Sequence, residues 1–110
     1  MGNEPLLSPH ERALQILAEL ENRFDKAVLV LKEKQGLYEM EKAKTRLKLK
    51  KQCADDKVKA TVSDLDAMVL LAHEKEPFKS IYVDFSKQEA IVAVLRTQKE
   101  QAKRNFWESK

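Results

Sequence analysis

Six basic side chains lie within ten consecutive residues of this 110-residue sequence, and no acidic side chain separates them. Residues 42–51, the basic segment, read KAKTRLKLKK and contain Lys42, Lys44, Arg46, Lys48, Lys50 and Lys51. The residues before the segment carry 5 bases and 8 acids and those after it carry 10 of each, so this segment produces the formal net charge of +3. Such a local excess of like charge is typical of a surface that binds a polyanion.

The spacing of these bases indicates what they can contact. On a helix, Lys44, Lys48 and Lys51 fall on one side, and Lys42, Arg46 and Lys50 form an adjoining stripe. Lys57 and Lys59 follow and extend the patch. The segment contains no aromatic residue, which favours contact with phosphates over base stacking, and Tyr38, one turn earlier, is the nearby stacking candidate. A solvated basic face that acids of a neighbouring helix neutralise is an equally compatible interpretation.

Other residues with chemical potential have no partners at a useful spacing. The two histidines, His10 and His73, lack a spaced carboxylate or thiol, so we interpret both as surface residues. Cys53 is the sole cysteine, which excludes an intrachain disulfide and suits a reducing cytosol. The two glycines form no phosphate-binding loop. We therefore predict that the protein is not an enzyme and has no catalytic residue, cofactor or metal site.

A long first helix is predicted to carry the basic segment. Ser8 can cap it, Pro9 suits its first position and Glu11 can complete a capping box, so the helix should run from Pro9 to near Cys53. Apolar residues recur along it at helical spacing, namely Leu14, Leu17, Leu20, Phe24, Val28, Leu31 and Tyr38. Within residues 42–51 apolar and basic residues alternate, which also fits a short strand. We favour helix because Lys, Arg, Leu and Ala are strong helix formers.

A short helix and a second long helix are predicted to follow. The run TVSDLD at residues 61–66 indicates a helix start with Ser63 as the cap and Asp66 three residues later. Pro77 should close the short helix and open the last one. The last helix repeats apolar residues at a spacing of three to four, interrupted by Gln88 and Lys99. The fold class is therefore all-α, a long–short–long arrangement whose two long helices form an antiparallel hairpin.

This composition predicts self-association of a single helical domain. Residues 1–7 should be a flexible tail and residues 8–110 the domain, which is small for a stable monomer because each long helix buries only one stripe. We expect the seams within or between copies at Phe24, Leu31, Phe78, Phe85, Val92, Leu95 and Phe106. No apolar run approaches the roughly 18 residues of a membrane span, so we expect no membrane association.

Three stretches of the sequence carry a family resemblance, namely YEMEKAKTRL at residues 38–47, TVSD at residues 61–64 and LRT at residues 95–97. Together they resemble the UvsY-type recombination mediators of bacteriophages. The likeness extends diffusely over residues 14–108. It implies that a Lys-x-Arg-Leu element, here Lys44, Arg46 and Leu47, contributes to binding single-stranded DNA. It also implies a closed homo-oligomeric ring, contacts with a recombinase and a single-strand-binding protein, and a cytoplasmic location in a bacterial host cell.

These observations lead to two functional hypotheses. In the first, the protein is a phage recombination mediator that binds single-stranded DNA through the basic segment and assists the loading of a recombinase or annealing protein. In the second, it is a non-enzymatic coiled-coil interaction module, such as a small phage inhibitor or assembly adaptor, whose basic segment docks on an acidic protein surface.

Overall fold

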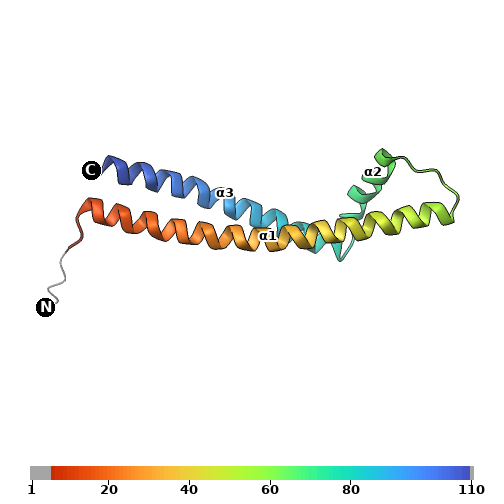
Figure 1. The fold of residues 1–110 in the computed structure, drawn as a ribbon, viewed down its shortest axis with the longest axis horizontal. Coiled ribbons are helices and arrows are strands. Elements are labelled where there is room, and N and C mark those ends of the chain that lie inside the picture. Colours follow the sequence, from red (N-terminus) through yellow and green to blue (C-terminus); the bar gives the residue numbers. More distant parts are fainter. Residues whose placement is uncertain (1–5, 110) are drawn as a thin grey trace. The chain divides into compact units, whose positions relative to one another are not determined.

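The computed structural model describes residues 6–109 and consists of three helices (Figure 1). They are α1 (Pro9–Asp55), α2 (Val62–Ala72) and α3 (Phe78–Glu108), and residues 6–109 contain no strand. The all-α class and the long–short–long order are thus confirmed. Within the same residues no helix is both long enough and apolar enough to cross a membrane. Most of the predicted tail lies outside the described residues, and Leu6 and Leu7 form no regular structure.

Helix α1 is continuous through the basic segment, so the helical prediction for residues 42–51 is confirmed over the strand. The predicted cap is also present, because the Ser8 hydroxyl accepts a hydrogen bond from the Glu11 N–H at 3.1 Å. At its other end the helix closes at Lys57, whose φ of 56° lies in the left-handed region. The Val58 N–H donates to the Cys53 carbonyl at 2.8 Å, as in a Schellman motif, although that left-handed position usually holds glycine.

The start of α2 corrects the predicted cap by two residues. Thr61, and not Ser63, is the cap: its hydroxyl accepts from the Asp64 N–H at 3.1 Å. In return, the Thr61 N–H donates to the Asp64 carboxylate at 3.0 Å. A capping box needs an acceptor three residues after the cap, and both candidate pairs have that spacing, so the sequence pattern alone did not separate them.

The predicted role of Pro77 is half correct. Helix α2 ends at Ala72, five residues before Pro77, so the proline does not terminate it. It does immediately precede α3, and its carbonyl accepts a hydrogen bond from the Ile81 N–H at 3.3 Å. Proline fits there because the first turn of a helix needs no donor from it.

Contacts divide the chain into two compact units. Unit 1 combines α1 up to Val30 with α3 from Glu89 onward, and unit 2 spans Leu31–Gln88. In each unit a stretch of α3 packs antiparallel to a stretch of α1, and unit 2 also contains α2 (Figure 1).

Unit 1 has a thin core with polar side chains at its edges. Its buried residues are Leu17, Ala27, Val92 and Ala102. Lys99 interrupts the apolar pattern of α3, and its Nζ lies 4.2 Å from the centroid of the Phe24 ring, so this lysine belongs to the seam. His10 is half-buried: its ring stacks on Phe106 at 4.6 Å and its Nδ1 lies 2.9 Å from the Ser109 hydroxyl. The prediction of a plain surface histidine is therefore wrong, because this ring joins the two helix ends.

Unit 2 is held together by an aromatic cluster around Tyr38 of α1. Its buried residues are Leu65, Val69, Phe78 and Gln88. The Tyr38 ring lies 5.1 to 5.8 Å from the rings of His73, Phe78, Tyr82 and Phe85. The His73 Nδ1 lies 2.8 Å from the Val69 carbonyl, which can only accept, so Nδ1 donates to it, and Nε2 lies 2.9 Å from the Tyr38 hydroxyl. His73 is thus part of the cluster and not a plain surface residue.

The seven residues predicted to form seams all lie within the helix packing. Phe78 and Val92 are buried, at 3% and 4% exposed. The other five are half-buried, namely Phe24, Leu31, Phe85, Leu95 and Phe106. These contacts lie within one chain, and self-association stays a prediction.

Phe78→Ala should lower the free energy of unfolding by about 3–5 kcal/mol, the range for truncating a buried phenylalanine. Phe78 is 3% exposed, and the centroid of its ring lies 4.1 Å from that of the His73 ring. The truncation therefore leaves a cavity inside the aromatic cluster. Leu47→Ala is the control, because Leu47 is 69% exposed in the same unit and should change the free energy by less than about 0.5 kcal/mol. Denaturant unfolding followed by circular dichroism measures both, and equal losses would contradict this account of the core.

Thr61→Ala should destabilise the protein by about 1 kcal/mol through loss of the cap, whereas Ser63→Ala should have less than half that effect. The Thr61 N–H, with a smaller contribution from its hydroxyl, holds the pKa of Asp64 below its usual value of 3.8. A lowered pKa in the folded state contributes stability that is complete above the usual value and is lost as the pH falls through the lowered one. Thr61→Ala keeps this N–H, so both proteins should lose the Asp64 contribution as the pH falls below about 4, and only the smaller hydroxyl share of their difference in thermal unfolding should fade there. A larger effect of Ser63→Ala would contradict the assigned cap.

Candidate nucleic-acid interface

The basic segment forms one exposed stretch of α1 within unit 2. Its five lysines are all exposed, and Arg46 is half-buried. At about 1.5 Å per residue these ten residues extend over roughly 14 Å, enough to face several phosphates of one strand. The helix presents the lysines on a rigid backbone, so binding needs to order only their side chains.

One acid of a neighbouring helix reaches this segment. Arg46 Nη1 donates to Asp66 Oδ1 of α2, and the two side chains are 37% and 59% exposed. Within residues 6–109 the five lysines make no ion pair. Neutralisation by a neighbouring helix, the alternative from the sequence, therefore applies to one base of the six.

The pairing of Arg46 with Asp66 was not predicted from sequence. Asp66 was interpreted there as a helix-start residue, whereas it contributes no cap, and its carboxylate faces α1 instead. The two residues are 20 positions apart. Only the return of α2 towards α1 brings them together, and no spacing rule in the sequence indicates that contact.

Two lysines of the segment lie beside a groove between α1 and α2. Lys44 and Lys48 line this groove of about 770 Å³, and Lys42, Lys50 and Lys51 do not. The continuous helix keeps Lys44, Lys48 and Lys51 on one side, as predicted, and the groove reaches only the first two. All five lysines are exposed, and Lys42, Lys50 and Lys51 lie outside the groove.

Tyr38 is not a base-stacking residue in this arrangement. Its ring stacks on Phe85 with a centroid distance of 5.1 Å and an interplanar angle of 7°, and its hydroxyl bonds to His73. The ring is occupied by the core of unit 2, which corrects its interpretation from sequence. The candidate interface consequently offers lysines, which suit phosphates, and carries no aromatic platform of its own.

Lys57 and Lys59 lie in the connection after α1 and are exposed. Lys57 has a structural role besides its charge, because its left-handed backbone closes α1. The structure gives no contact that joins these two lysines to the basic segment. Their contribution to the interface stays a prediction.

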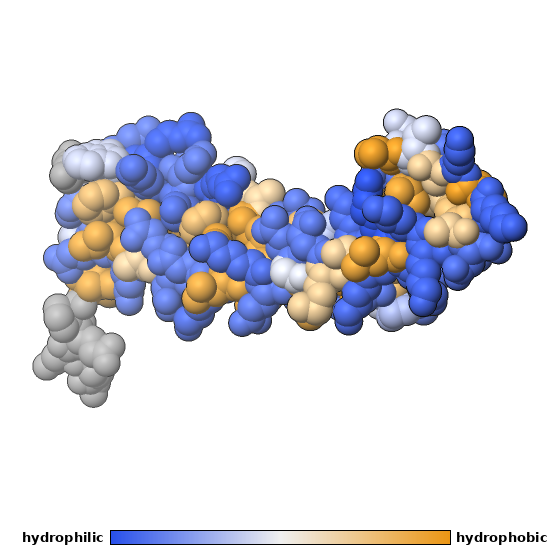
Figure 2. All heavy atoms as spheres, turned by 45° about the vertical axis from the view of Figure 1, so that its right-hand side comes forward, coloured by the Kyte–Doolittle hydropathy of each residue, from blue (hydrophilic) through white to orange (hydrophobic). Residues whose placement is uncertain are grey.

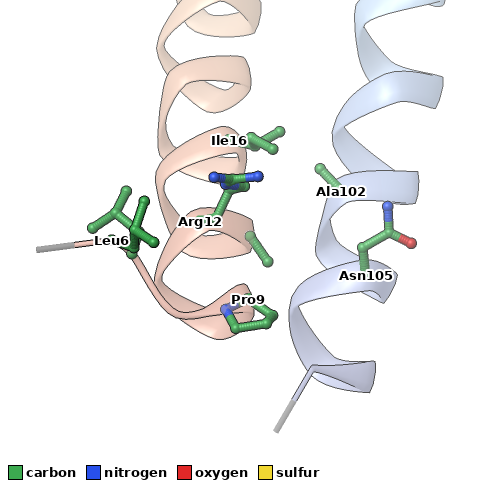
Figure 3. Close-up of a pocket in the computed structure, with 8 residues that line it drawn as sticks. Leu6, Pro9, Arg12, Ile16, Ala102 and Asn105 are labelled. Atoms are coloured by element: carbon green, nitrogen blue, oxygen red, sulfur yellow. The ribbon is translucent and has the colours of Figure 1, made fainter.

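A smaller groove lies where α1 begins and α3 ends, with a volume of about 370 Å³ (Figure 3). Its lining is mostly apolar, with Leu6, Pro9, Ile16 and Ala102 among its residues, and Arg12 is its one charged side chain. This lining holds no pair suited to acid–base or nucleophilic chemistry. Across residues 6–109 there is also no group of three or more His, Cys, Asp or Glu side chains placed to hold a metal ion.

No protein-family model, curated protein or solved structure matches this sequence. The resemblance to UvsY-type mediators therefore stays a prediction.

Proposed function

We propose that this protein binds single-stranded DNA through the exposed lysines of the basic segment and acts as a phage recombination mediator. The observation that carries the proposal is the concentration of five lysines on one helical stretch without an ion pair among the described residues. Like charges repel at this spacing, and a polyanion relieves that repulsion. The mediator role itself comes from the family resemblance and rests on it alone.

The binding chemistry would be electrostatic. Lysines that neutralise phosphates release condensed counterions from the strand, so affinity falls as salt rises. With no free aromatic ring in the segment, contact is with the backbone and is insensitive to sequence. One segment binds weakly, whereas several copies joined in an assembly gain avidity without new contacts. A strand held along its backbone leaves its bases accessible to a recombinase or annealing protein.

The interaction-module hypothesis uses the same lysines against an acidic protein surface. The two hypotheses differ in one cheap measurement, which is binding of an unstructured deoxythymidine oligonucleotide. Absence of binding at low salt would end the proposal for DNA and leave the acidic protein surface as the partner.

Lys50→Ala with Lys51→Ala should weaken oligonucleotide binding and make its salt dependence shallower. Each lost phosphate contact on a single strand reduces the log–log slope by about 0.7, so two should reduce it by about 1.4 per chain. Both lysines are exposed and alanine is a strong helix former, so the fold should be unaffected. Fluorescence anisotropy with a labelled oligonucleotide, repeated across a salt titration, measures the change.

The matched control is Lys79→Ala with Lys87→Ala. These lysines are exposed on α3 of the same unit and give the same change in net charge away from the basic segment. If both double variants bind equally and with equal slopes, the basic segment is not the DNA surface and only net charge matters.

Asp66→Asn should have the opposite effect and strengthen oligonucleotide binding. The substitution releases Arg46 from its ion pair and removes one negative charge beside the segment. Asp84→Asn is the control, since Asp84 is exposed on α3 of the same unit and the charge change is identical. An Asp66→Asn affinity no higher than that of Asp84→Asn would mean that Arg46 does not reach the strand. The same anisotropy assay at fixed salt provides this comparison.

A further inference from the structure

Helix α2 leaves much of its apolar surface uncovered. Its 11 residues bury Leu65 and Val69 against the rest of unit 2. Val62, Leu70 and Leu71 are 67%, 68% and 66% exposed. Figure 2 shows hydrophobic side chains at the surface around this helix. Leu70 and Leu71 line different grooves, so these exposed side chains form separate apolar faces of the helix and not one patch.

One side of α2 borders the groove that Lys44 and Lys48 line. Its apolar walls come from Leu49 and Cys53 of α1 and from Met68 and Leu71 of α2. Of these four residues, Leu71 is exposed and the other three are half-buried. The groove is therefore an apolar trough with one protruding leucine on its edge.

The charges around this groove balance. Three lysines line it, Lys44, Lys48 and Lys75, together with three acids, Glu41, Asp56 and Glu76. A purely acidic partner would meet as many like charges as opposite ones. A groove with equal numbers of both signs suits a second copy of itself, because a two-fold arrangement can set bases of one copy opposite acids of the other.

We propose that a second copy of this chain covers this groove in a two-fold pair, with Leu71 of each copy seated against the apolar wall of the other. The pairing buries Leu71, which the monomer leaves to water, and it locates the interface outside the helix seams. It does not require DNA binding, although Lys44 and Lys48 belong to both the groove and the basic segment. If both hold, the rim positions of Lys44 and Lys48 bring the basic segments of the two copies next to each other.

Leu71→Gln tests this interface, and Leu70→Gln is its control, because the two adjacent leucines face different grooves. Leu70 has the same exposure as Leu71 and lines a different groove, with Tyr38, His73 and Tyr82. Leu71→Gln should weaken association roughly a hundredfold, since each pair loses two buried leucines, and Leu70→Gln should leave it unchanged. Sedimentation equilibrium over a range of protein concentrations measures the association constant of each, and circular dichroism checks that both remain helical.

Cys53 supplies a second, independent readout in the wild-type protein. It is the sole cysteine and lines the groove, so its rate of reaction with an aromatic disulfide reagent reports whether the groove is covered. The rate per thiol should fall several-fold as protein concentration passes the association midpoint, and in Leu71→Gln it should stay at the dilute value. This readout decides the matter even where the variant loses helicity.

Three results would overturn the proposal. The first is a wild-type chain that stays monomeric at high concentration with a constant Cys53 reaction rate, which would leave the groove to a different partner. The second is association that both glutamine variants weaken equally. The third is association without any protection of Cys53, which would place the interface elsewhere on the chain.

Discussion

The packing of Tyr38 against aromatic rings that lie later in the chain is the contact on which unit 2 depends. The rings of His73, Phe78 and Phe85 lie 5.7, 5.8 and 5.1 Å from it, and the His73 ring is also hydrogen-bonded to its hydroxyl. Phe78 is the buried ring of this cluster, and with Leu65 and Val69 it makes up the buried apolar core of unit 2 among the described residues. The cluster holds the residues that follow α2, and the first turns of α3, against α1. The position of α2 in turn determines both the acid beside Arg46 and the groove beside Lys44.

The fold tolerates the like charges of the basic segment because its lysines face water and not protein. Its lysines are exposed, so solvent and ions screen their mutual repulsion, and the strong helix propensity of Lys, Leu and Ala maintains α1 through the charged stretch. The ion pair of Arg46 with Asp66 is exposed and contributes little stability of its own. The five lysines form no ion pair within residues 6–109, and this is the observation on which the proposed anionic partner rests.

Lys44 and Lys48 belong both to the groove beside α2 and to the basic segment. The proposed self-association would therefore affect the proposed DNA binding. A helix of 11 residues that buries only two of its apolar side chains is poorly covered for an isolated chain. Covering it with a second copy would add apolar burial where the monomer has least. It would also join two weak phosphate-binding segments into one multivalent surface, which is the physical requirement for tight backbone binding by isolated lysines.

The helical class, the order of the helices and the position of the basic segment follow from local patterns in the sequence. Helical periodicity and the Ser8 cap defined α1, and the density of lysine identified the basic segment, because these are local properties of neighbouring residues. Sequence spacing did not reveal the partner of Arg46, the occupied ring of Tyr38 or the inward roles of His10 and His73. Each of these depends on residues 20 to 99 positions apart. Only the tertiary packing of α1 with α2 and α3 decides which of those side chains meet, and that packing left five lysines for solvent or a partner.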